Sequence, residues 1–540
     1  MPASKATSLA PVQLELNSST VAKSAVSLTK HGLLSATSLL VAANAASKLM
    51  GFAREVLTAR AYGVSAQVDA FLVSLSVPDL VGSALGAAMA AALIPRLAAL
   101  GSDPNQAHQY ARRLLSVSVY LSIFLLALSF FGAGWIVKLF APGISPAVMP
   151  LAVNITRVLS IVTAVLFLDR VLAGIFQGFQ HFLWPAVSVL MFNACSILFL
   201  VLFANSRGIW ALVDGWTLGV VLAMVLQGVL LIRFLGTPIL RGLPASDLQR
   251  LGRNGLEIFF LTSVPSLAYV LARAFAATLE EGSVATLGYA QRLFQLPVEV
   301  VIMGVLLGAY PMLAKMSCEA DKKQLAIFIN ELGRTLLLIT TLISTLMIVL
   351  SHDLVEIVFQ RGAFNIHATA ATSAVLFCIA PALPGLATAL FAMRVFMSCG
   401  RTGEVILPVF VALILDGFLS WIVAPRFGTP GIAAVFSLTW NILAVQMIVA
   451  LRKQTAEFHP VSFLLSGGRI YLTSALTCVA LIVAYNKTGF PHAFLTGILA
   501  TILFLGPVLV MEREQRSIMR KLLKRFGQIT RQSVPQPEIS

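Results

Sequence analysis

Eight basic residues lie inside long apolar stretches of this sequence, where charged side chains are rare. They are Lys48, Arg54, Arg60, Arg157, Arg170, Arg273, Arg292 and Arg394. A basic side chain at the centre of a membrane-spanning helix costs about 2.5–3.5 kcal/mol on insertion scales, so several together indicate a function. Because guanidinium groups bind phosphate through paired hydrogen bonds, this set predicts a site for a phosphate or pyrophosphate group.

Three of these arginines are expected at one depth in the membrane. Arg54, Arg273 and Arg292 each lie about eight residues, or roughly 12 Å, from the same-side end of their predicted helices. Lys48 joins them as a candidate binding residue, and it shares a helix face with Glu55, seven residues on. Long basic side chains near helix ends can instead reach the headgroup region. That alternative fits Arg60, Arg170 and Arg394.

Cations outnumber carboxylates at the depth inferred for these arginines, and three carboxylates are candidate gate or ion-pair residues: Glu55, Asp69 and Asp79. Glu55 and Asp69 could pair with Arg54 or Arg60 across the first helical hairpin. At 4 Å and an effective dielectric near 20, such a pair is worth about 4 kcal/mol before desolvation. A structural pair and a gating pair fit the sequence equally well. The excess of cations predicts a cavity that prefers an anion.

Composition places the chain among polytopic membrane proteins. Only 11% of its 540 residues are charged, 58% are hydrophobic, and the mean hydropathy is +0.89. The net charge of +15 could suggest nucleic acid, but Lys and Arg occur in short connections and a tail, so no nucleic-acid partner is expected. No nucleotide-binding loop, catalytic triad or metal-ligand spacing is present. We therefore expect no enzyme activity, metal or cofactor, although membrane potential or a coupling ion could drive transport.

Apolar stretches long enough to cross a bilayer of about 30 Å predict fourteen helices. The predicted spans are 33–62, 67–98, 108–138, 148–178, 182–205, 209–235, 254–281, 284–315, 323–358, 367–399, 402–425, 430–451, 469–487 and 492–511. With a cytoplasmic N-terminus, nearly all basic residues of the connections fall on the cytoplasmic side. This bias predicts that both termini are cytoplasmic.

A sequence repeat links the two halves of the chain. Pro78 matches Pro297, and Gly143 matches Gly362, at one offset of 219 residues. Chance matches in apolar sequence are the alternative, but we interpret the pattern as a duplicated six-helix unit in parallel orientation. Two such lobes usually form a transporter with its site between them, whereas a channel more often repeats around a pore.

The predicted fold is therefore all-α, with about 14 transmembrane helices in two parallel six-helix lobes plus two C-terminal helices. The expected segments are a disordered extension over 1–32, an N-lobe over 33–235, a cytoplasmic linker over 236–253, a C-lobe over 254–451, two appended helices over 452–511 and a basic cytoplasmic tail over 512–540. The tail could lie on anionic lipid or serve only as a positive anchor.

Four motifs resemble one transporter family. They are SKLMGFAREVLTARAYG (47–63), VDAFLVSLSVPDL (68–80), ALIPRLA (92–98) and YAQRLFQLPVEVV (289–301). Together they resemble the MurJ/MviN family of lipid II flippases within the MOP exporter superfamily. GFARE followed by DAF is the most specific part, and the likeness extends over residues 33–511.

The resemblance implies a V-shaped pair of lobes in the bacterial inner membrane that moves undecaprenyl-pyrophosphate-linked peptidoglycan precursor outward by alternating access. The headgroup would enter a cationic cavity, and the lipid tail would follow a groove near the last two helices. The family's cavity arginines correspond to Lys48, Arg54 and Arg292, and its gate-side carboxylate resembles Asp69. Membrane lipid and cell-wall synthesis proteins are the implied partners.

The chain departs from the family where Gly82, Ser83 and Ala87 replace expected charges, and where Gln291 replaces an acidic residue. A compensating cation is one explanation, with Arg273 or Arg157 as the candidates. Another is a different polyprenyl-linked saccharide, such as an exopolysaccharide or O-unit. A cation-coupled drug exporter and an envelope-assembly scaffold are more distant alternatives.

Overall fold

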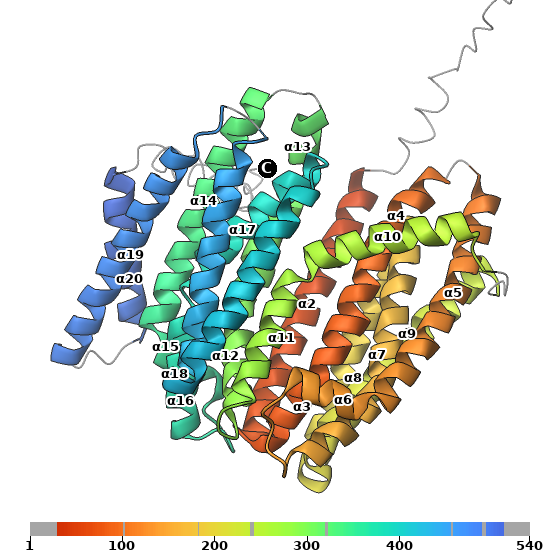
Figure 1. Cartoon of the computed structure of the whole chain (residues 1–540), viewed down its shortest axis with the longest axis horizontal. Coiled ribbons are helices and arrows are strands. Elements are labelled where there is room, and N and C mark those ends of the chain that lie inside the picture. The colour runs from red at the N-terminus through yellow and green to blue at the C-terminus, as the bar shows by residue number, and fades with distance from the viewer. Residues whose placement is uncertain are drawn as a thin grey trace, which may run out of the picture.

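The computed structural model describes a chain of helices (Figure 1). It describes residues 30–100, 103–181, 183–237, 242–318, 322–454, 457–488 and 493–511. The predictions for most of the N-terminal extension and for the basic tail concern residues outside these ranges.

The first half of the chain forms a bundle that we call the N-lobe. Its elements are α2 (Lys30–Tyr62), α3 (Ala66–Val77), η1 (Pro78–Ala84), α4 (Leu85–Ala99), α5 (Pro104–Phe131), α6 (Ala133–Phe140), α7 (Met149–Gly178), α8 (Leu183–Arg207) and α9 (Ile209–Leu235). Helix α7 lies at the centre, in contact with α3, α4, α5 and α9. Because α7 is central, 72% of its most apolar stretch is buried, a larger share than in any other described span.

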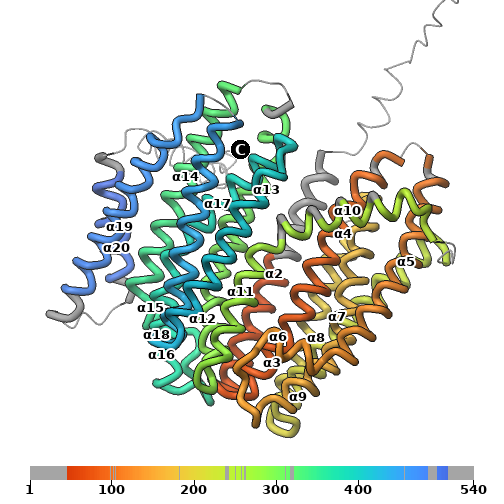
Figure 2. Tube along the Cα trace, viewed as in Figure 1, coloured from red at the N-terminus to blue at the C-terminus, as the bar shows by residue number. Residues whose placement is uncertain are grey.

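The second half forms the C-lobe and its appendage. The C-lobe comprises α11 (Val264–Ala276), α12 (Ser283–Pro297), η2 (Val298–Ile302), α13 (Met303–Cys318), α14 (Lys322–Val349), α15 (Ser351–Phe359), α16 (Ile366–Ile379), α17 (Ala382–Ser398) and α18 (Gly403–Leu451). The appended helices, α19 (Pro460–Thr488) and α20 (Ala493–Met511), pack against α14 at one edge of the molecule (Figure 2).

The expected fold class is confirmed. Among the described residues, nine helices are long and apolar enough to span a membrane, or up to eleven when two bent pairs each count as one span. Helix α18 alone contains the two spans expected over 402–425 and 430–451, joined at a kink where Gly428 adopts φ 61°. The chain is thus a multi-pass membrane protein.

The span expected over 254–281 is bent. Helix α10 (Ala245–Thr262) packs along α4 of the N-lobe, and the chain turns by 59° before α11 begins. Pro265, at the start of α11, explains the break because proline lacks the N–H that would continue the helical ladder. Helix α10 therefore bridges the two lobes (Figure 1).

Two π-helices occupy matching positions in the lobes. Element η1 begins at Pro78, and η2 follows Pro297 directly, the two prolines that the repeat aligns. A proline removes one hydrogen-bond donor from the helical ladder. π-Helices are rare in proteins, and those that occur often lie at functional sites. Each carries a carboxylate, Asp79 in η1 and Glu299 in η2.

The lobes converge at the end of the molecule where α2 ends and splay apart at the other end (Figure 1). At this closed end, the Ala363 N–H donates to the Arg60 carbonyl at 2.9 Å, and the Tyr289 hydroxyl donates to the Gly63 carbonyl at 3.0 Å. A Cβ on Gly63 would lie 2.4 Å from the Ala363 oxygen, so only glycine allows this backbone approach.

We predict that Gly63→Ala destabilises the protein more than Gly208→Ala does. Both glycines have positive φ, 57° at Gly63 and 55° at Gly208, which disfavours alanine at either position. A Cβ at Gly208 meets nothing within 4 Å, whereas one at Gly63 clashes with Ala363 of the C-lobe. We call the region where the two lobes meet the lobe seam. Thermal unfolding of the purified variants measures the difference. Equal decreases in the unfolding midpoints of the two variants would contradict the importance of the close backbone contact between Gly63 and Ala363.

Candidate substrate site between the lobes

Arg54 points into the N-lobe rather than into lipid. Its guanidinium bonds Glu55 Oε1 at 2.9 Å and Asn193 Oδ1 at 3.3 Å, and it lies 4.4 Å from the ring centre of Trp216. The side chain is only 7% exposed. Packing against an indole face stabilises a guanidinium that has left water. Sequence reasoning missed Asn193 and Trp216, because no local pattern brings α8 and α9 to α2.

Glu55 lies between an arginine of each lobe. The same Oε1 atom that contacts Arg54 is 3.5 Å from Arg292 Nε on α12. Glu55 is 13% exposed and Arg292 27% exposed, so the three groups form a half-buried bridge between the lobes. A carboxylate shared by two arginines leaves this triad with a net positive charge.

Arg273 of α11 makes a second contact between the lobes. Its Nη1 lies 3.6 Å from Asp79 Oδ2 and 3.4 Å from both Ser76 Oγ and the Leu72 carbonyl. Arg273 Nε is buried without a hydrogen-bond partner among the described residues. Of the two arginines considered as compensating cations, the structure brings this one to the seam, while Arg157 is exposed on α7.

A small cavity joins these groups. Its lining includes Glu55, Arg273, Tyr289, Gln291 and Arg292, so it lies where the lobes meet. Gln291 is 2% exposed, and neither of its amide atoms finds a partner in the described part of the chain. Buried polar atoms without partners favour a polar ligand or water in such a space.

Lys48 reaches the C-lobe at a more exposed place. Its Nζ lies 2.5 Å from Glu299 Oε2, with side chains 55% and 37% exposed, respectively. An exposed pair of this kind contributes about 1 kcal/mol or less. The pairing mirrors that of Asp79 with Arg273, because in each case a carboxylate on a π-helix meets a cation of the opposite lobe.

Asp69 pairs with backbone rather than with an arginine. Its two carboxylate oxygens accept from the N–H groups of Gly282 and Ala285, at 2.6 and 2.7 Å. These N–H groups begin α12, where unpaired donors and the helix dipole attract a negative charge. Asp69 of the N-lobe thereby caps a C-lobe helix at the closed end, which sequence spacing had not indicated.

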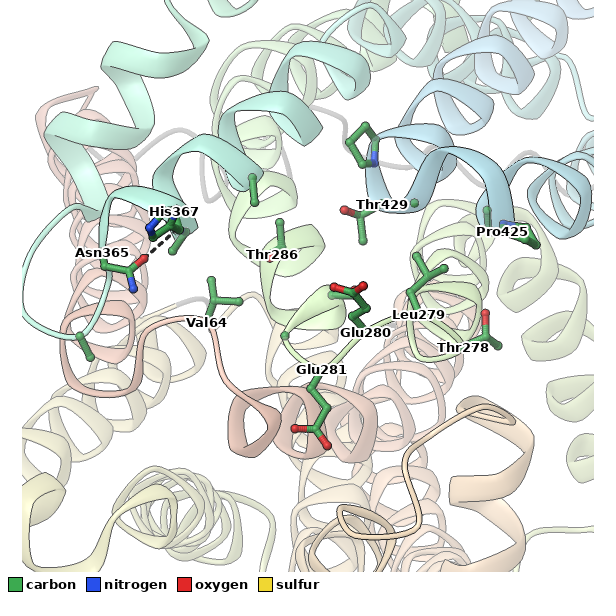
Figure 3. Close-up of a pocket in the computed structure, with 18 residues that line it drawn as sticks. Val64, Thr278, Leu279, Glu280, Glu281, Thr286, Asn365, His367, Pro425 and Thr429 are labelled. Carbon is green, nitrogen blue, oxygen red and sulfur yellow. Dashed lines mark hydrogen bonds between the residues drawn. The ribbon is translucent and has the colours of Figure 1, made fainter.

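Beyond this cap lies a larger cavity of about 850 Å³. It is lined by residues from both lobes, including Val64, Asn365 and Thr429 (Figure 3). Figure 3 shows Glu280 among the hydroxyl-bearing side chains, while Glu281 points away from them. Gly282 bonds Asp69 and also lines this larger cavity. The contact between Asp69 and the start of α12 therefore separates the larger cavity from the arginine cluster.

Two helical lobes joined by ionic contacts around a charged cavity are an arrangement typical of membrane transporters. The sequence pattern of the family described as "Lipid II flippase MurJ" matches residues 58–505. The chain therefore belongs to the MurJ lipid II flippase family, whose members are transporters and not enzymes.

Relatives and solved structures agree with this assignment. The chain is 26% identical over 428 residues to the lipid II flippase MurJ of Burkholderia cenocepacia, covering 76% of this chain and 81% of that one. It is 25% identical over 424 residues to a probable lipid II flippase MurJ of Rhizobium tropici, covering 76% and 79%. A structure of lipid II flippase MurJ in an inward closed conformation matches its fold with TM-score 0.75 at 20% identity, covering 88% and 99%. An inward-facing MATE multidrug resistance transporter matches with TM-score 0.65 at 14% identity, covering 76% and 94%.

Proposed function

We propose that this protein flips a polyprenyl-pyrophosphate-linked saccharide, most simply lipid II, from the cytoplasmic to the outer leaflet of the bacterial inner membrane. The observation that carries the proposal is the cluster of three arginines, Arg54, Arg273 and Arg292, around the two carboxylates Glu55 and Asp79 where the lobes meet. That cluster suits a doubly charged pyrophosphate, because each guanidinium can offer two parallel hydrogen bonds. Its basic character argues against a cationic drug as cargo.

The carboxylates suggest how substrate binding and lobe movement are connected. Glu55 pairs with Arg292, and Asp79 pairs with Arg273, so each carboxylate of the N-lobe contacts an N–H donor of a C-lobe arginine. An arriving pyrophosphate competes for the same donors and, on binding, releases both carboxylates. Two contacts that hold the lobes together are then lost, which favours their separation at the closed end. A ligand shifts a conformational equilibrium only through such differential contacts.

The direction of transport follows from the proposed topology. With both termini cytoplasmic, the splayed end of the lobes faces the cytoplasm and the Asp69 cap faces outward. An inside-negative potential favours outward movement of an anion by about 2.3 kcal/mol per charge per 100 mV. The lipid tail would stay in the membrane, following the family's route along α19 and α20.

A second candidate is another polyprenyl-linked saccharide. The observation that favours it is Gly82, where the resemblance leads one to expect a charged side chain. A Cβ there would lie 2.7 Å from the Thr163 carbonyl of α7, so η1 packs too closely for a larger residue. Gly82 therefore departs from the family's pattern by packing against α7, and Arg273 of the opposite lobe supplies a cation near this element instead.

Reconstituted flipping distinguishes these substrates. Proteoliposomes containing the protein would receive lipid II or a polyprenyl-pyrophosphate carrying an unrelated oligosaccharide, and outer-leaflet exposure of each would be followed with time. We expect lipid II to flip faster. Faster flipping of the other lipid would select the second candidate, and movement of neither in correctly inserted protein would contradict the proposal.

A further inference from the structure

Asp169 is a buried carboxylate that the proposed substrate site does not use. It lies on α7 inside the N-lobe and is 5% exposed. Within the described residues no basic side chain forms an ion pair with it, unlike Glu55 and Asp79 at the seam. A buried charge without a cationic partner is costly, and a carboxyl group in that position can relieve the cost by taking up a proton.

The hydrogen-bond partners of Asp169 are neutral and incompletely satisfied, although Arg170 lies next to it on α7 without forming an ion pair with it among the described residues. The Gln227 amide donates from Nε2 to Asp169 Oδ1 and to Ser188 Oγ, the latter at 2.8 Å. Gln227 is fully buried, and its Oε1 has no partner among the described residues. Ser188 in turn donates to the Pro185 carbonyl at 2.8 Å. Gln227 Oε1 is therefore an unpaired hydrogen-bond acceptor close to the Asp169 carboxylate, and the described residues supply no hydrogen-bond donor to it.

A cavity leads from Asp169 toward the lobe seam. It has a volume of about 150 Å³, and Asp79, Ser83, Asp169, Arg170 and Ser188 are among its lining residues. A water molecule occupies about 30 Å³ of liquid, so the space can hold several. Asp79 belongs both to this cavity and to the ion pair with Arg273, which connects the interior of the N-lobe to the contact between lobes.

Few charged groups face this cavity. Element η1 contributes Asp79 and α7 contributes Arg170, whereas the described lining residues from α8 and α9 are uncharged. Arg54 lies against the rings of Phe192 and Trp216, which themselves line the cavity. The other helices packed against α7 place no charged residue in the described lining.

We propose that Asp169 is a proton-binding site of the N-lobe whose occupancy is linked to the Asp79–Arg273 contact. One proton moves from cavity water to a carboxylate oxygen and leaves by the same route, and no other bond changes. When the lobes are joined, Arg273 neutralises Asp79. When they separate, Asp79 becomes an unpaired negative charge facing the cavity, which favours a proton on Asp169. By linkage, protonation of Asp169 then favours separation of the lobes.

Infrared difference spectra between acidic and alkaline pH test the site without any substrate. Protein in liposomes with potassium buffers should show the carbonyl stretch of a protonated carboxyl group at acidic pH. We expect Asp169→Asn to remove one such component and Asp169→Glu to keep it at a shifted frequency. Asp214→Asn is the matched control, since it removes an α9 carboxylate that already pairs with Arg207 at 2.8 Å; it should leave the component intact.

Three outcomes would overturn the proton assignment. The first is an unchanged spectrum in Asp169→Asn. The second is loss of the same component in Asp214→Asn. The third is a carboxylate that stays ionised throughout the pH range and responds only to added Na⁺. If Asp169→Asn does not fold, the predicted frequency shift in Asp169→Glu decides the question alone.

The link to transport rests on the proposed function and has its own measurement. With the membrane potential clamped at zero, an imposed pH gradient should change the flipping rate of lipid II by about fivefold or more, since coupling energies are typically 1–3 kcal/mol. Asp169→Asn should flip at a rate independent of the gradient. A gradient response that persists in this variant would overturn the coupling. Absence of any flipping by the unmodified protein would count against the proposed substrate, while the infrared result would still stand.

Discussion

Arg292→Ala will lower the rate of lipid II flipping by about 100-fold or more while leaving the amount of inserted protein unchanged. In the proposed complex Arg292 binds the pyrophosphate; losing one partner of such a charged contact costs about 2–5 kcal/mol, and 2.7 kcal/mol corresponds to a factor of 100. Arg292 is 27% exposed, so its removal leaves a void that water can enter, and the fold should tolerate it. Flipping in proteoliposomes, normalised to reconstituted protein, measures the effect.

Arg54→Ala should also abolish flipping, but with a structural cost that Arg292→Ala does not share. Arg54 packs on Trp216 and bonds Asn193, so its loss leaves a buried space inside the N-lobe. Comparing thermal unfolding of the two variants separates the contributions of folding and binding. Arg292→Lys should retain part of the activity, because it keeps the charge and loses the paired hydrogen bonds.

Arg394→Ala is the matched control for both substitutions. Arg394 is also a C-lobe arginine within an apolar helix, but it lies 5.9 Å from the ring centre of Tyr310 and outside the arginine cluster. Its substitution should leave flipping nearly unchanged. If Arg54→Ala and Arg292→Ala both flip normally, the cationic cavity does not bind the substrate, and a scaffold for envelope-assembly enzymes becomes the better interpretation.

Glu55→Gln is expected to weaken the joined lobes strongly and to make the protein sensitive to free pyrophosphate. The substitution leaves Arg54 and Arg292 without the carboxylate they share. Breaking a buried ion pair by removing one partner costs about 3–5 kcal/mol. Because Arg292 is partly exposed, we expect the lower part of that range, which would reduce the midpoint of thermal unfolding by roughly 3 °C in a chain of 540 residues.

Inorganic pyrophosphate makes this prediction specific to the site. An anion that fills the place of Glu55 should raise the unfolding midpoint of Glu55→Gln more than that of the unmodified protein. Glu356→Gln serves as control, since Glu356 is 49% exposed and its contact with His352 is 3.9 Å long. No destabilisation of Glu55→Gln, or equal stabilisation of all three proteins by pyrophosphate, would contradict the role assigned to the shared carboxylate.

Much of the fold could be predicted because its signals are local. Each span is a run of apolar residues, and the predicted spans correspond to the helices from α2 to α20 with few exceptions. The exceptions have local causes that act through geometry: Pro265 breaks the seventh span, and the Gly428 kink joins two others into α18. The prolines at the start of η1 and the end of α12 were visible in sequence, but the π-helices at these positions were not.

The sequence alone determined that this is a polytopic membrane protein and that cations lie at unfavourable positions within its spans, and it predicted that the two halves are related. These conclusions follow from hydrophobic length, spacing and charge, which each segment carries by itself. Only the tertiary structure decided which groups meet. It joined Glu55 to Arg292 and Asp79 to Arg273, set Asp69 on the backbone of α12, and buried Asp169 beside Gln227. Such contacts join residues far apart in the chain, so they depend on how the helices pack and on the few ångströms over which ionic and hydrogen bonds act.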